Sequence, residues 1–122
     1  MSEAQRTEIF ASAAVSAAGN TSSFSLPTAS NLYVGIDVTA WANAGPAFTF
    51  QVSDDGGTTW YDYAVDVQMN ASNSVGTNST SLVTTIAGKY SMLLKNLAAD
   101  RYRIRWTVAS GSATFSISVV AK

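Results

Sequence analysis

Strict alternation of apolar and polar side chains is the feature that most constrains the fold of this chain. Every second residue is apolar in four segments: Leu32–Val38, Phe48–Val52, Tyr102–Val108 and Phe115–Val119. Side chains on a β-strand point to opposite faces in turn, so this period of two predicts strands with one buried and one exposed face. An amphipathic helix would instead repeat about every 3.6 residues.

Weaker strand signals fill much of the remaining chain. They cover Glu8–Val15, Ser22–Leu26, Trp60–Val67, Leu82–Ile86 and Tyr90–Leu94. The Ala-rich stretch 11–18 has helix propensity, but its serines and the Gly-Asn pair after it favour a small-residue edge strand. We therefore predict an all-β fold, a single antiparallel β-sandwich or jelly-roll-like domain of about eight short strands separated by turns.

The length of 122 residues fits one domain. We expect residues 1–7 to form a short N-terminal arm and residues 8–122 to form the sandwich. Segment 70–81 is rich in Asn, Ser and Thr and carries no charge, which predicts a long polar loop. We expect neither a Sec signal peptide nor a membrane partner, because no basic segment leads into an apolar one and no apolar run reaches about 18 residues.

Missing residue types limit the chemistry of the chain. It has no cysteine and no histidine, which excludes disulfides and thiolate nucleophiles and argues against most zinc sites and catalytic triads. We therefore expect no enzyme and no cofactor. The net charge of -1 also argues against a nucleic acid partner.

The surface should be unusually poor in charge. Charged residues make up 12% of the chain, against about a quarter in a typical globular domain. Charge is one of the devices that keep β domains apart. The composition therefore indicates an oligomer or a larger assembly, or else a stable protein of a saline or extracellular setting.

The segment Ser53–Trp60 fits the pattern Ser-x-Asp-x-Gly-x-Thr-Trp and resembles the Asp-box hairpin of sialidase-type propellers. In such a turn Asp55 accepts hydrogen bonds from backbone amides, Gly57 takes a positive φ and Trp60 packs beneath the loop. The box occurs once, on a chain too short for a propeller. We therefore predict a rigid hairpin in which Ser53, Asp55, Gly57 and Trp60 are structural residues.

Acidic residues gather near this turn, at Asp54, Asp55, Asp62 and Asp66. Their spacing does not follow an EF-hand loop, so a solvated turn or a weak calcium site are the alternatives. Asp55 and Asp62 would be the carboxylates of a small glycosidase, but that chemistry needs a cleft and a raised pKa. We predict no metal ligand and no catalytic residue.

Arg101, Arg103 and Arg105 fall on the polar face of one predicted strand, about 7 Å apart. Three like charges in a row repel one another unless carboxylates face them. The candidate carboxylates within the chain are Asp37, Asp62 and Asp66. The alternative is an acidic patch on another protein, because arginine is enriched at interfaces.

Four aromatic residues lie near predicted turns: Trp41, Trp60, Tyr61 and Tyr63. Such rings can form a platform on which sugars stack, or they can plug the core or an interface. With the three arginines they complete our set of interface candidates.

Three further segments resemble a layout found in small structural proteins of tailed-bacteriophage virions. They are Glu8–Ala14, Asn31–Ala40 and Asp100–Val108. In that group an Ala-Ser-Ala-Ala first strand leads to an Ile-Asp-Val-Thr-Ala strand, a variable middle and an arginine-rich strand before the last one. The resemblance spans most of the chain, although the Asp-box-like turn and segment 70–81 depart from it.

The resemblance implies a non-enzymatic virion component, made in the host cytoplasm and located on the capsid surface. Within that group we expect a capsid decoration or cement protein that binds the major capsid protein as a homo-oligomer, with a trimer favoured. Residues 1–7 would lie along the shell as a strap. The alternative is a tail or baseplate adhesion or carbohydrate-binding module that uses the four aromatic residues.

Overall fold

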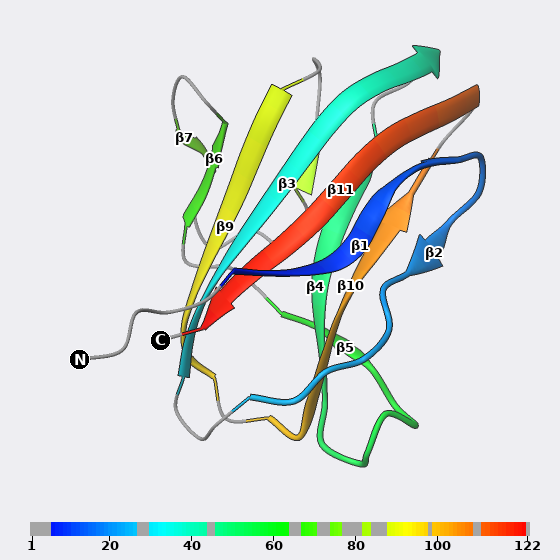
Figure 1. The fold of residues 1–122 in the computed structure, drawn as a ribbon. Coiled ribbons are helices and arrows are strands. Elements are labelled where there is room, and N and C mark those ends of the chain that lie inside the picture. The colour runs from blue at the N-terminus through cyan, green and yellow to red at the C-terminus, as the bar shows by residue number, and fades with distance from the viewer. Residues whose placement is uncertain are drawn as a thin grey trace.

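The alternating segments pair into two antiparallel β-sheets (Figure 1). A computed structural model describes residues 6–26, 30–43, 46–63, 67–70, 74–76, 82–83, 88–97, 99–108 and 111–121. Within these residues all regular structure is β. No helix in this part of the chain is long and apolar enough to span a membrane.

The strands are β1 (Arg6–Val15), β2 (Gly19–Asn20), β3 (Ser30–Asn43), β4 (Ala47–Ser53), β5 (Tyr61–Asp62), β6 (Val67–Asn70), β7 (Ser74–Gly76), β8 (Leu82–Val83), β9 (Gly88–Leu97), β10 (Arg101–Thr107) and β11 (Gly111–Ala121). Six of them form one sheet in the order β1-β11-β3-β9-β6-β7. The other sheet has the order β2-β10-β4-β5, with β8 also paired to β4. Figure 1 shows β9, β3, β11 and β1 side by side, with β4 and β10 behind them.

The core lies between the two sheets and is built from the apolar face of each alternating strand. Leu32, Val34, Ile36 and Val38 of β3 are all buried, as the alternation predicts. Aromatic rings join the layers: Phe48 of β4 meets Phe115 of β11 edge to face, with ring centroids 4.9 Å apart. Buried apolar area contributes roughly 25 cal/mol per Å² to stability, and an aromatic pair of this kind adds about 1 kcal/mol.

The predicted single antiparallel sandwich is confirmed, and with its shortest strands counted it has more elements than the eight or so that alternation reveals. The described residues hold eleven strands. Five of these contain only two to four residues, too few to leave a clear alternation in the sequence. In contrast, β3 runs for 14 residues.

Two of the weaker strand predictions are only partly realised. In Ser22–Leu26 a single bridge joins Phe24 to Tyr102. The predicted strand Trp60–Val67 is divided between the two sheets, because Tyr61–Asp62 pairs with β4 whereas Val67 pairs with Leu93 of β9. The chain therefore crosses from one layer to the other within this segment.

The domain boundaries also differ in detail from the sequence prediction. Arg6 and Thr7, expected in the N-terminal arm, belong to β1 and pair with Val120 and Val119 of β11. Residues 1–5 lie outside the described residues. Within the predicted loop 70–81, Ser74–Gly76 forms β7 and pairs with β6, so the segment is not a loop throughout; most of the remainder is not described.

Candidate functional site

The outward side of the five-stranded sheet carries the arginine row, and we call this surface the arginine face. On β10, Tyr102, Ile104 and Trp106 are buried, so the alternate residues Arg101, Arg103 and Arg105 point outward. The strand register places Arg103 opposite Gln51 and Arg105 opposite Thr49 on β4. Further members are Asp62, paired with Gln51, and Asn20, paired with Arg105.

Neutral amides, not carboxylates, face two of the arginines. Arg103 donates from Nε to Gln51 Oε1 at 2.8 Å. Gln51 in turn donates from Nε2 to Asp62 Oδ1 at 2.8 Å. Arg105 donates from Nη1 to Asn20 Oδ1 over a long 3.4 Å. The buried Gln51 thus lies between the guanidinium and the carboxylate. Its amide oxygen and its amide nitrogen each have a hydrogen-bond partner.

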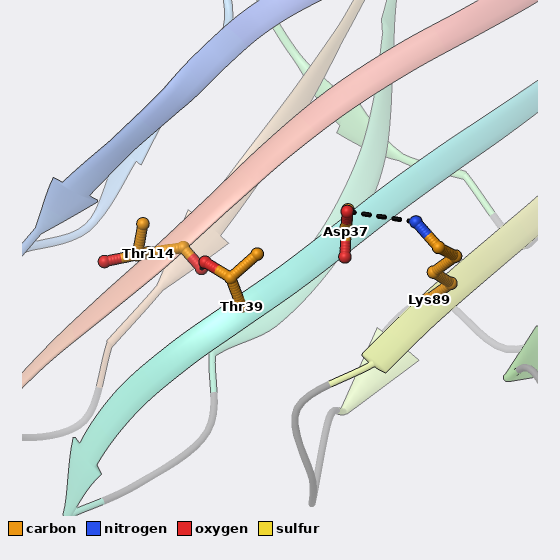
Figure 2. Close-up of polar contacts among 4 residues, drawn as sticks. All are labelled: Asp37, Thr39, Lys89 and Thr114. Atoms are coloured by element: carbon orange, nitrogen blue, oxygen red, sulfur yellow. Dashed lines mark hydrogen bonds and ion pairs between the residues drawn. The ribbon is translucent and has the colours of Figure 1, made fainter.

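The predicted ladder of arginines and carboxylates is therefore not present among the described residues. Asp62 is bound by Gln51. Asp37 lies in the other sheet, where its Oδ2 is 3.1 Å from Lys89 Nζ (Figure 2). Asp66 is outside the described residues. The physical reason is register: Gln51 occupies the position opposite Arg103 that a carboxylate would need.

Arg103 is also stacked on an aromatic ring. Its Cζ lies 4.3 Å from the centroid of the Trp60 ring, within the range of a cation–π interaction. Partial burial lowers the pKa of Arg103, and repulsion by Arg105 lowers it further. The guanidinium is therefore fixed in place, between Gln51 and Trp60, in an environment that does little to neutralise it.

The turn beneath Trp60 has the hydrogen bonds that its sequence pattern predicts. Asp55 Oδ1 accepts from the backbone amides of Thr58 and Thr59, at 3.1 and 2.8 Å. The Ser53 hydroxyl donates to the same oxygen at 2.7 Å and accepts from the Gly57 amide at 3.0 Å. The hydrogen bonds that Asp55 accepts, led by that from the Thr59 amide and followed by that from the Ser53 hydroxyl, lower its pKa to about 2.

Two further features hold the turn. Gly57 has a φ of 99°, a conformation that favours glycine. Trp60 donates from Nε1 to the Gly57 carbonyl at 3.0 Å, so the indole closes the loop as expected. The turn is also tied to the start of β10, because the Asp100 amide donates to the Ser53 carbonyl at 3.0 Å.

This arrangement gives the arginine face an acidic end. Asp54, Asp55 and Asp100 are exposed at the turn beside Arg101, and a Cβ added to Gly56 would lie 3.8 Å from Asp100 Oδ2. No group of three potential metal ligands occurs among the described residues. Asp55 is also a poor general acid for a glycosidase, because that role needs a raised pKa and its pKa is lowered.

The four aromatic candidates do not form one platform. Tyr63 packs against the core, with its ring centroid 6.3 Å from that of Phe50. Trp60 lies beneath Arg103, and Tyr61 is 59% exposed next to it. The backbone of Trp41 belongs to β3 in the other sheet, where it pairs with Ala113; its side chain is not described.

A hollow on the outward side of the six-stranded sheet was not predicted from the sequence. It has a volume of about 330 Å³ and lies over Gly35, between Tyr33, Asp37, Lys89 and Ser118. Tyr33 is 50% exposed beside it. Figure 2 shows Asp37 of β3 and Lys89 of β9 reaching toward each other at this site. The available signal was a glycine at an outward position of a long alternating strand, where a side chain is expected.

Comparisons with known proteins support the fold and do not assign a family. No protein-family model matches the chain, and no curated protein shows significant similarity to it. Among solved structures, it is similar to the SPBc2 prophage-derived protein YomS, with a TM-score of 0.64 and 14% sequence identity. The match covers 100% of this chain and 97% of YomS. The chain therefore shares its β-sandwich fold with a prophage-derived protein.

Proposed function

We propose that this chain is a non-enzymatic structural protein of a phage virion, and that it decorates the outer surface of the capsid shell. The assignment to a phage is supported by the fold that this chain shares with a prophage-derived protein over nearly the full length of both chains. The layout of Glu8–Ala14, Asn31–Ala40 and Asp100–Val108 supports the same assignment. The partner would be the major capsid protein, and the active form a homo-oligomer, with a trimer favoured.

The surface supports a role in assembly. Charged residues are 12% of the chain, and β1 forms one edge of the six-stranded sheet. Residues 11–14 on this edge are exposed, small and uncharged. Natural proteins often protect exposed strand edges with charge, proline or bulges. β1 has register shifts between Glu8 and Phe10 and between Phe10 and Ala13, but residues 11–14 carry neither charge nor proline, and an edge so poor in charge suits a protein that is covered in its working state.

The mechanism follows from mass action. A protein that binds the assembled shell and not its separate subunits shifts the equilibrium toward the shell. Each stable contact of this kind buries about 1,600 Å² in total. Contacts placed across the joints between capsomers would then raise the temperature at which the shell comes apart.

The proposal is tested by heating shells with and without the protein. Saturating protein should raise the disruption temperature of bare shells, as followed by calorimetry or light scattering. Bovine serum albumin at equal mass is the control for crowding. An unchanged disruption temperature at saturation contradicts decoration.

The hollow over Gly35 favours a second candidate, a tail or baseplate adhesion module that binds glycans. An exposed tyrosine next to a polar pair is a suitable arrangement for one sugar ring, which stacks on the aromatic face and hydrogen-bonds at its edge. A glycan array tests this directly. Signals that disappear in Tyr33→Ala would support the adhesion module, and a silent array would remove it.

A further inference from the structure

The three arginines of the arginine face form no ion pair with another described residue. The ion pair Lys89–Asp37 lies on the opposite sheet. The guanidinium of Arg101 is exposed and makes no hydrogen bond or ion pair with the described residues. Within the described part of the chain, the side-chain hydrogen bonds of Arg103 and Arg105 go to the neutral oxygens of Gln51 and Asn20. Three cations in a row thus remain available to carboxylates from outside.

The central cation is preorganised for a partner. Arg103 is held by the 2.8 Å bond from Nε to Gln51 and by the Trp60 ring beneath it. Only its Nε is used in that bond, so its terminal nitrogens remain available to a ligand. Because the side chain is already ordered, less conformational entropy is lost when a partner binds.

The spacing of the row matches an extended peptide. Alternate residues on a strand lie about 7 Å apart, and this holds for the three arginines of β10 as well as for the carboxylates of an extended segment with an acidic residue at every second position. Each guanidinium can then meet one carboxylate, and arginine binds carboxylates with two parallel hydrogen bonds. The flanking Thr49, Thr107 and Asn20 add neutral hydrogen-bonding groups along the row.

The acidic end of the face selects against nucleic acid. A phosphate backbone that followed the row past Arg101 would run against Asp54, Asp55 and Asp100. The net charge of -1 provides no wider positive field to offset that repulsion. A protein segment with only a few carboxylates avoids this repulsion, because its acidic residues can stop opposite Arg101.

We propose that the arginine face is a docking surface for an acidic, extended segment of a partner protein, whose carboxylates alternate with uncharged residues. This inference rests on the proposed function in one respect: the natural partner would be an exposed acidic strand or loop of the shell. The recognition chemistry itself requires only the described residues of this chain.

The test uses the whole protein and three fluorescent probes of equal length. They are a peptide alternating Glu and Thr, its Gln and Thr counterpart, and oligothymidylate. The Glu peptide should bind, and its affinity should fall when ionic strength rises from about 0.1 to about 1 M, which shortens the screening length from about 10 to about 3 Å. The Gln peptide and oligothymidylate should bind at least tenfold more weakly than the Glu peptide.

Variants locate the site. Arg101→Gln combined with Arg105→Gln should weaken binding of the Glu peptide about fivefold, because each exposed ion pair contributes modestly. Arg103→Lys keeps the charge but loses the forked geometry, and should also weaken it. Lys95→Gln, an exposed cation on β9 of the other sheet, is the matched control and should leave binding unchanged. Unfolding temperatures check that every variant is folded.

Three results would overturn the proposed docking surface. They are no binding of the Glu peptide, a loss of peptide affinity in Lys95→Gln as large as that in the arginine variants, and binding of oligothymidylate as tight as that of the Glu peptide. Shell binding is measured separately on the same variants. Peptide binding without shell binding would leave the docking surface in place and remove the decoration role. If the arginine variants bind shells as well as the wild type does and the Glu peptide does not bind, the docking surface is removed and the decoration role remains.

Discussion

Arg103 of β10 lies over Trp60 of the turn that follows β4, with 4.3 Å between the guanidinium carbon and the ring centroid. Trp60 also donates to the Gly57 carbonyl, so one indole closes the turn and supports the central arginine. The rigid turn and the charged row therefore form one structural unit. A change at Trp60 should affect both stability and binding.

Trp60→Ala should destabilise the protein by about 1–2 kcal/mol, because it removes the cation–π contact and the bond to Gly57. Denaturant unfolding measures this. Tyr61→Ala is the control, since Tyr61 is the next residue and is 59% exposed; it should change stability by less than about 0.5 kcal/mol. Equal effects of the two variants would show that Trp60 does not hold the turn.

Asp55→Asn should alter the acid dependence of stability. The pKa of Asp55 is lowered from 3.8 to about 2 in the folded protein. A lowered pKa means that the ionised carboxylate stabilises the fold above its unfolded pKa, and that this stabilisation is lost as pH falls through about 4 to 2. The unfolding temperature of the wild type should therefore fall more steeply over that range than that of Asp55→Asn. Parallel curves would contradict the hydrogen-bonded carboxylate.

Phe115→Ala should cost about 3–5 kcal/mol, the usual range for removing a buried aromatic ring. Phe115 is fully buried and contacts Phe48 and Trp106, with centroids 4.9 and 5.2 Å away. Val120→Ala, on the outward face of the same strand, should cost less than about 1 kcal/mol. Comparable losses in the two variants would mean that the sheets do not pack through Phe115.

Two glycines should respond in opposite ways to the same substitution. A Cβ added to Gly19 would lie 2.8 Å from Cζ2 of Trp106, and that indole is buried and bound to the Ala17 carbonyl. Gly19→Ala should therefore destabilise by about 1–3 kcal/mol. At Gly35 the nearest atom would be 3.9 Å away, so Gly35→Ala should be neutral or stabilise by up to about 1 kcal/mol. Thermal unfolding of the two variants compares them directly.

The buried faces could be predicted from the sequence because a strand places alternate residues on opposite sides. Tyr102, Ile104 and Trp106 are buried between outward arginines, as the alternation requires. The Ser53–Trp60 turn could also be predicted, since its hydrogen bonds are local and join residues at most four positions apart. These features depend on short-range geometry alone.

The contacts of the arginines could not be predicted, because they depend on register between distant strands. Gln51 faces Arg103 across 52 positions of the chain, and a shift of one residue would have placed a different side chain there. The same reason explains why Asp62 lies next to Gln51 while Asp37 pairs with Lys89. Alternation predicts which side a residue faces and not which residue lies beside it.

The crossing between layers after β5 was missed for a related reason. Tyr61 and Val67 both have β propensity, so the sequence reads as one strand, yet the two residues pair in different sheets. The hollow over Gly35 could not be predicted either. The lack of a side chain at Gly35 leaves a hollow only when the fold brings Tyr33, Lys89 and Ser118 around that position.

The most direct measurement is co-sedimentation of the protein with bare shells assembled from the major capsid protein of the proposed phage. The proposed function predicts saturable binding at a fixed ratio to capsomers, with the protein oligomeric by light scattering. Arg101→Gln combined with Arg105→Gln should lower the bound amount, whereas Lys95→Gln should not. A monomer that stays in the supernatant at every concentration would contradict the decoration role.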